Sequence, residues 1–236
     1  MVEQRQITIA IPSWNRSDMT IESFYDVYED ERISEIVIVD DASDFEVYED
    51  LKSMTDALPK VKLYRNLTNQ DCYFNKATAI GYATNERAIL LDSDNKIDKS
   101  YLDRLYAIEK WEINTIYTPS FAAPNFDFRP YENLVLTREN VAQYIDKPML
   151  ETCLNAANYF VDVYKYLEVF DSKTNPVTSD SIYQCYNWLL EGGRIEIVSG
   201  LTYQHRVHSG SHYQNNQSRT PIGFHESILN KLRELT

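Results

Sequence analysis

The chain has 236 residues, of which 43% are apolar and 25% are charged, so it is long enough for one domain with a substantial core. Its formal net charge of −13 argues against nucleic acid and against an anionic membrane surface as general partners. An anionic substrate therefore needs a local cation to neutralise it, which favours a bound metal ion.

The cysteines and the N-terminal residues bear on the cellular location. Cys72, Cys153 and Cys185 have no metal-type spacing, and an odd number gives no disulfide framework, which favours a reducing, cytoplasmic compartment. The opening MVEQRQITIAIP has no signal-peptide pattern, and no apolar run approaches the roughly 20 residues that span a bilayer. We expect no transmembrane segment, and a chain that is soluble or is the soluble part of something larger.

Strand and helix patterns alternate through the first half of the chain. The apolar and β-branched runs predict strands at Gln6–Pro12, Glu35–Asp40, Val61–Tyr64 and Ala88–Leu91. The three- and four-residue apolar spacings predict helices at Met19–Tyr28, near Phe74–Thr84 and after Ser100-x-x-Asp103, which has the form of a capping box. This order predicts an α/β fold with a mostly parallel central sheet flanked by helices, in one domain over residues 1–236.

The second half is less regular. Pro119–Pro130 has the composition of a loop, and Ser209–Thr220 is polar enough to predict a mobile loop. Strands are expected at Ala156–Val161 and Arg194–Val198, and a helix at Ile182–Leu190 that ends before Gly192-Gly193.

Three polar clusters follow predicted strands, at Ser13–Arg16, Asp40–Ser43 and Asp92–Asn95. Ligands of parallel α/β sheets bind at the carboxyl ends of the strands, so these clusters predict a site. Asp92 and Asp94 are two positions apart on an extended chain, where both carboxylates can share one cation. Carboxylate oxygens suit Mg²⁺ or Mn²⁺, which often bridge protein and substrate phosphates. The alternative is a solvated acidic turn that caps the next helix.

Several segments together resemble the family 2 glycosyltransferases with the GT-A fold, over roughly residues 6–210. The similar segments, in the order of the family, are ITIAIPSWNRSD, IVIVDDASD, AILLDSDN, TSDSIYQCYNWLLEGGRIEIV and TYQHRVHSGS. The resemblance implies an inverting enzyme that transfers a sugar from a nucleotide-diphosphate sugar, UDP-linked, to a glycan hydroxyl. It also implies a nucleotide-binding part at about residues 6–110 and an acceptor-side part at about 111–220.

The resemblance further implies which residues bind the nucleotide: Pro12, Ser13, Trp14, Asn15, Asp41, Lys76 and Ser93. Trp14 would pack beside the base, and the alternative is a turn residue folded back onto the core. Asp41 would accept a hydrogen bond from a uracil-like ring, whereas Asp40 or Asp41 could instead cap the following turn. Lys76 departs from the Arg-Asn pair of the family because Ala77 follows it, and a solvated surface lysine is the alternative to a diphosphate contact.

The same resemblance implies a general base at Asp180 and a metal ion, Mn²⁺ or Mg²⁺, held by Asp92, Asp94 and His208. An acid in the first turn of a helix is also favoured as a simple N-terminal cap, and His208 could instead be a surface histidine. Arg206 could meet a phosphate. Asp180 would take a proton from the acceptor hydroxyl as that oxygen attacks the anomeric carbon.

Two other functions stay open. A haloacid-dehalogenase-like phosphatase also carries an apolar strand followed by D-x-D, although that motif normally lies on the first strand and Lys96 stands where Thr or Val is usual. A non-catalytic module that binds a sugar nucleotide or a glycan is the second alternative. Neither Asp180 nor the two acids of the D-x-D motif have been lost, which favours an enzyme.

Overall fold

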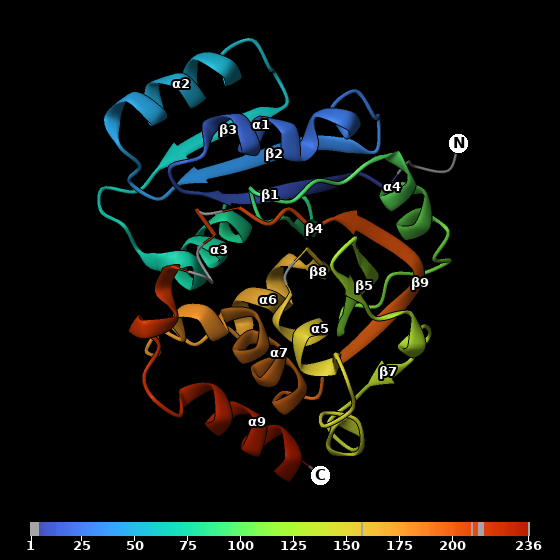
Figure 1. Ribbon diagram of the computed structural model, residues 1–236. Coiled ribbons are helices and arrows are strands. Elements are labelled where there is room, and N and C mark those ends of the chain that lie inside the picture. Colours follow the sequence, from blue (N-terminus) through green and yellow to red (C-terminus); the bar gives the residue numbers. More distant parts are fainter. Residues whose placement is uncertain (1–4, 157, 209, 212–214, 236) are drawn as a thin grey trace.

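A computed structural model describes residues 5–156, 158–208, 210–211 and 215–235 (Figure 1). Its centre is one nine-stranded sheet with the order β3-β2-β1-β4-β8-β5-β9-β7, in which β6 pairs with β5 off this path. The strands are β1 Ile7–Ser13, β2 Ile33–Asp40, β3 Val61–Arg65, β4 Arg87–Leu90, β5 Thr115–Ala123, β6 Phe126–Asp127, β7 Val135–Leu136, β8 Phe160–Asp162 and β9 Arg194–Gln204.

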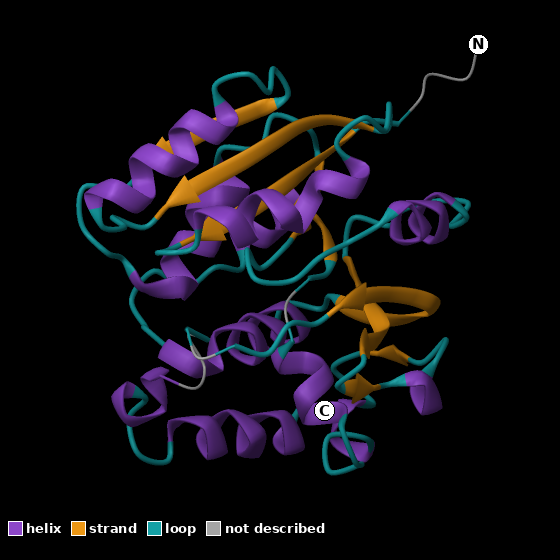
Figure 2. Cartoon of the chain, turned by 45° about the horizontal axis from the view of Figure 1, so that its top comes forward, coloured by secondary structure: helices purple, strands orange, loops and turns teal. Residues whose placement is uncertain are grey.

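Helices flank the sheet and fill the space beside its second half (Figure 2). The α-helices are α1 Ser17–Phe24, α2 Phe45–Thr55, α3 Asp71–Gly81, α4 Lys99–Tyr106, α5 Leu150–Asn155, α6 Val163–Glu168, α7 Asp180–Leu190 and α9 Phe224–Glu234. The short 3₁₀ helices are η1 Tyr25–Val27, η2 Arg129–Tyr131, η3 Val141–Gln143, η4 Val177–Ser179 and η5 Gln217–Arg219. In the described ranges, no helix is long and apolar enough to cross a membrane.

The first four strands form the parallel part of the sheet. β1 lies between β2 and β4, and β2 also pairs with β3, all in the parallel sense. The apolar runs of β1, β2 and β4 are buried because helices cover them, as expected for a parallel sheet. The register pairs Ser13 with Asp40, so the polar residues that end β1 and β2 meet at one edge.

The second half makes the sheet mixed. β8 pairs antiparallel with β4 and with β5, β7 pairs antiparallel with β9, and β5 and β9 are parallel. The predicted α/β fold is confirmed, and the parallel pairs are confined to β1–β4 and to β5 with β9.

Two local predictions are wrong. Pro119–Pro130 is not one loop, because β5 continues through Ala123 and β6 follows at Phe126–Asp127. Pro119 lies within the β5–β9 pairing, next to a register shift that accommodates a residue without an amide proton. Ser100 is not the cap of α4, since the Asp98 carboxylate accepts hydrogen bonds from the backbone amides of Ser100 and Tyr101.

The helix predicted at Ile182–Leu190 is confirmed, and it begins two residues earlier, at Asp180. It ends where expected, because Gly192 has a φ of 74° and a Cβ on Gly193 would lie 2.2 Å from Cδ1 of Trp188. Of the mobile loop predicted at Ser209–Thr220, residues 209 and 212–214 lie outside the described residues.

Candidate active site

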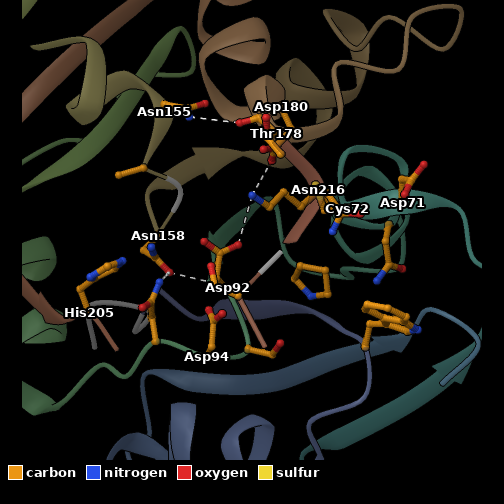
Figure 3. Close-up of a pocket in the computed structure, with 18 of the residues that line it drawn as sticks. Asp71, Cys72, Asp92, Asp94, Asn155, Asn158, Thr178, Asp180, His205 and Asn216 are labelled. Carbon is orange, nitrogen blue, oxygen red and sulfur yellow. Dashed lines mark hydrogen bonds and ion pairs between the residues drawn. The ribbon is translucent and has the colours of Figure 1, made fainter. Parts of the chain in front are cut away.

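A cavity of about 830 Å³ opens where the polar clusters of β1, β2 and β4 meet α3, α5 and the start of α7. This volume is typical of a small-molecule site. Figure 3 shows that Asp92 lies between Asp94 and Asp180 in this cavity. The predicted site residues that line it are Pro12, Ser13, Trp14, Asp41, Lys76, Asp92, Ser93, Asp94 and Asp180.

Trp14 and Asp41 lie on the β1–β2 side of the cavity. Trp14 is 41% exposed and lines the cavity, so it is not folded onto the core. Oδ1 of Asp41 accepts hydrogen bonds from Nδ2 of Asn66 at 2.7 Å and from the backbone amide of Gln70 at 2.8 Å. Burial raises the pKa of Asp41 above its ordinary value, although these two bonds oppose the shift.

Asp40 and Asn15, which are next to Asp41 and Trp14 in the sequence, form hydrogen bonds within the loops after β1 and β2. Asp40 caps a turn, because its Oδ2 accepts from the amide of Ser43 at 3.1 Å. Asn15 has a φ of 50° and joins the two loops, since its amide donates to Oγ of Ser43 and its Oδ1 accepts from the amide of Asp44, both at 2.8 Å. Asn15 is not among the described residues that line the cavity.

Asp94 is surrounded by cationic and imidazole groups. Its Oδ2 forms an ion pair with Arg16 and lies 3.0 Å from Nε2 of His208. Burial acts to raise the pKa of Asp94, but Arg16 and His208 outweigh it, and the pKa lies below its ordinary value. Arg206 donates to the backbone oxygen of Asp94 and pairs with Glu22, so it holds the loop rather than projecting freely.

Asp92 and Asp180 share one buried lysine. The ammonium of Lys76 lies 2.6 Å from Oδ2 of Asp180, 3.1 Å from Oδ1 of Asp92 and 3.2 Å from Oγ of Ser181. Burial and the neighbouring Asp94 raise the pKa of Asp92, while Lys76 acts in the opposite direction. The alternative of Lys76 as a solvated surface lysine is wrong, because only 6% of the residue is exposed. It links two carboxylates that come from β4 and α7.

The predicted metal ligands are only partly brought together. In the part of the chain that the structure describes, no group of three or more His, Cys, Asp or Glu side chains is arranged to hold one. Two of the three predicted ligands, Asp94 and His208, do meet, and a carboxylate with an imidazole is a donor pair that suits Mn²⁺. Asp92 faces Lys76 instead. Asp94 and His208 are therefore the two residues that could hold a divalent cation, and Arg16 occupies the same carboxylate oxygen.

Sequence reasoning gave no role to two groups of this site. Arg16 lies in the predicted Ser13–Arg16 cluster, and its sequence position shows nothing of its contact with Asp94, 78 positions away. Asn158 has a φ of 79° and accepts through Oδ1 from the amide of Asp92 at 2.9 Å, which fixes the start of the D-x-D turn. A lone Asn in a predicted strand gives no signal for such a role.

Comparison with known proteins is consistent with this geometry. TarS 1-349 from S. aureus in complex with UDP-GlcNAc superposes with a TM-score of 0.68 at 14% identity, over 89% of this chain and 61% of that one. The mannosyltransferase PcManGT from Pyrobaculum calidifontis, in complex with GDP-Man and Mn²⁺, gives 0.63 at 13% identity, over 99% and 70%. The chain spans between 59% and 70% of the TarS 1-349 structures. These likenesses show a GT-A fold.

The sequence itself identifies the family. No curated protein matches the chain significantly. A family model described as "Glycosyl transferase family 2" matches residues 8–161, which run from the second residue of β1 through the D-x-D turn into β8. This match covers more than half of the chain, and the chain therefore belongs to glycosyl transferase family 2, a family of glycosyltransferases.

Proposed function

We propose that this glycosyltransferase moves a sugar from a nucleoside diphosphate sugar, UDP-linked, to a hydroxyl of a glycan, and that it inverts the anomeric configuration. The observation that carries the proposal is the meeting of Asp41, Asp94 and Asp180 in one cavity. Asp41 would contact the nucleobase, Asp94 would bind the metal ion, and Asp180 would accept the proton.

The nucleoside half of the donor would lie on the β1–β2 side. Trp14 offers a partly exposed indole face for stacking, and Asp41 is a buried carboxylate with Oδ1 fixed by two donors. Pro12, Ser13 and Ser93 line the same cavity. A carboxylate that accepts from a ring N–H suits a uracil.

Asp94 and His208 would hold the divalent cation, Mn²⁺ rather than Mg²⁺ because of the imidazole, with Asp92 beside them. When bound, the cation neutralises negative charge on the diphosphate leaving group. Arg16 lies on the same carboxylate oxygen and is the group that must give way to it. In a chain of net charge −13, such a local cation is the condition for binding a diphosphate.

Asp180 would take the proton of the acceptor hydroxyl. It lies in the first turn of α7 and lines the cavity, and its ion pair with Lys76 holds one oxygen in a fixed direction. Lys76 would then orient the base and Asp92 rather than contact the diphosphate directly, since its ammonium has both carboxylates as neighbours.

The glycan acceptor would enter beside α5 and the C-terminal residues that line the cavity, which are Asn216, Gln217, Arg219 and His225. We also propose a reducing, cytoplasmic location, which the three free cysteines support. The donors in the related structures, UDP-GlcNAc for TarS and GDP-Man for PcManGT, are the first two sugar nucleotides to test.

The test measures nucleoside diphosphate release from UDP-GlcNAc and from GDP-Man, with Mn²⁺ or with EDTA, in the presence of a glycan panel. We expect metal-dependent release that falls by about 10²- to 10⁴-fold in Asp180→Asn, because a general base contributes this much. Nucleotide binding by the variant should be retained. Hydrolysis of p-nitrophenyl phosphate without sugar-nucleotide turnover would favour the phosphatase, and binding without turnover would favour the non-catalytic module.

A further inference from the structure

The turn that precedes Asp180 has an unusual backbone. Val177, the first residue of η4, has a φ of 52°, in the left-handed region. A β-branched side chain is strained there, and such residues persist only where the surroundings impose them. Val177 is also 5% exposed, so solvent does not stabilise this conformation. Something else must hold the turn that begins α7.

Side chains from the α3 side and from the preceding loop hold Val177. Its amide donates to Oδ1 of Asn175 at 3.1 Å, and its carbonyl accepts from Sγ of Cys72 at 3.2 Å. Asn175 is itself fixed, because its Nδ2 donates to Asp71 at 2.8 Å. Both backbone groups of the strained residue are therefore satisfied by side chains instead of by a regular ladder.

The next residue, Thr178, is held in the same way. Its carbonyl accepts from Nδ2 of Asn155 on α5 at 3.2 Å, and the two residues lie beside Asp180 in Figure 3. Its amide donates to Oγ1 of Thr220 at 3.3 Å, and the hydroxyls of Thr178 and Thr220 lie 2.6 Å apart. Thr220 is 42 positions away, so a distant segment closes the set of contacts.

Thr220 belongs to residues 217–225, which we name the C-terminal strap and of which Gln217, Arg219 and His225 line the cavity. On one side Arg219 forms an ion pair with Asp71 at 2.8 Å. On the other side His225 bridges Oγ of Ser179, at 2.8 Å, and Glu151, at 2.6 Å. The strap thus contacts the residue directly before Asp180 as well as the N-terminus of α3.

We propose that Thr220 is a positioning residue for the general base: together with Arg219 and His225 it imposes the strained turn at Val177 and so fixes the start of α7, from which Asp180 projects. The inference rests on the proposed role of Asp180. It assigns a function in this reaction to a segment that follows the residues matched by the family model.

The experiment measures the effect of Thr220→Val on kcat in two backgrounds, the wild type and Val177→Gly. The substitution removes the hydroxyl of Thr220 and keeps the shape of the side chain. In the wild-type background we expect kcat to fall about tenfold, the order expected for losing a hydrogen bond to a buried backbone amide, with the donor KM within about twofold. In a Val177→Gly background the same change should cost less than about threefold, because glycine adopts a positive φ without strain.

Two controls accompany the pair. Thr220→Ser keeps the hydroxyl and should retain kcat within about threefold, and Ser218→Ala changes an exposed side chain of the same strap and should leave kcat unchanged. A melting temperature for every variant checks that each is folded. An equal loss of kcat in both backgrounds, or no loss in Thr220→Val, would overturn the proposal.

A second readout is independent of turnover. Hydrogen–deuterium exchange at the amide of Thr178 should be faster in Thr220→Val and should be unchanged in Ser218→Ala. Absence of transfer by the wild-type protein would refute the proposed function alone, because the exchange measurement still decides the role of Thr220. Unchanged exchange in Thr220→Val would refute that role even in an active enzyme.

Discussion

Asp92 and Asp180 face the same lysine, but the chain holds these two carboxylates by different means. Asp92 follows β4, whose backbone is fixed by ladders to β1 and β8, and its own amide is bonded to Asn158. Asp180 follows a turn that is held by side chains from four separate places in the sequence. Asp92 is positioned by the regular hydrogen bonds of the sheet. The position of Asp180 depends instead on individual side-chain contacts, which single substitutions can remove.

The largest effect is expected for a substitution of Lys76, which contacts both Asp92 and Asp180. Lys76→Met removes the only ammonium described between Asp92 and Asp180 and leaves the buried Asp180 and the partly buried Asp92 without it, so it should destabilise the protein by about 3–5 kcal/mol in urea unfolding. Lys76→Arg keeps the charge and should recover part of the loss. In Lys76→Met/Asp180→Asn one of the two carboxylates becomes neutral, and stability should again recover in part. A loss of under about 1 kcal/mol in Lys76→Met would mean that the two carboxylates do not depend on the lysine.

The metal ligand at the strand end comes next. Asp94→Asn keeps the size of the side chain but removes the charge that pairs with Arg16 and lies against His208. The Mn²⁺ concentration for half-maximal turnover should rise by about 10- to 100-fold, the range seen when metal-site groups are altered. Asp98→Asn, at the cap of α4 and away from the cavity lining, is the matched control and should leave this concentration unchanged. An unaltered metal requirement in Asp94→Asn would exclude Asp94 as a ligand.

The difference between the two regions also explains what could be predicted. The strands β1, β2 and β4 carry continuous apolar runs, and polar residues follow each run, so the sequence predicts both the parallel sheet and the edge where Ser13, Asp41 and Asp92 gather. Position along a strand is a local property, and local patterns reveal it.

Less of the second half could be predicted from the sequence, because its structure depends on long-range contacts. Pro119 reads as a loop residue, yet it lies in β5, where the pairing with β9 overrides the local preference. The contact of Lys76 with Asp180, at the start of α7, joins residues 104 positions apart. Long-range contacts also occur within the first half, where Arg16 meets Asp94 across 78 positions. Their residue types alone were compatible with solvated surface positions.

A smaller effect is expected for the nucleoside contact. Trp14→Ala removes the exposed ring beside the proposed base and should raise the donor KM by roughly tenfold, since stacking of one base is worth about 1–3 kcal/mol. The change lies on the β1 side, so kcat should stay within about threefold. Tyr25→Ala, at a 69% exposed ring outside the cavity, is the control for loss of an aromatic side chain. Equal changes in KM for both variants would remove Trp14 from the donor site.

The smallest effect is expected for a substitution of Glu35, in the parallel half of the sheet, and it concerns the stability of the protein. Glu35 on β2 is 3% exposed, and its carboxylate accepts hydrogen bonds from Lys62, Thr84 and Thr8. Burial acts to raise the pKa of Glu35, but these hydrogen bonds outweigh burial. The pKa therefore lies below its ordinary value of 4.5. A lowered pKa contributes stability above pH 4.5, which is lost as the pH falls through the folded-state value. Glu35→Gln should therefore cost about 1–2 kcal/mol at pH 7, and the gap to wild type should narrow below pH 4.5. A gap that is constant from pH 7 to pH 3 would contradict this assignment.

We propose that acids at the ends of the parallel strands bind a nucleoside diphosphate through a divalent cation. Isothermal titration of UDP and of GDP into the protein, with Mn²⁺ and with EDTA, measures this binding. We predict that one of the two nucleotides, UDP, binds at least about tenfold more tightly with Mn²⁺ than with EDTA, and that Asp94→Asn abolishes this difference. Binding of neither nucleotide in the presence of Mn²⁺, or equal affinity with and without the metal, would contradict the claim.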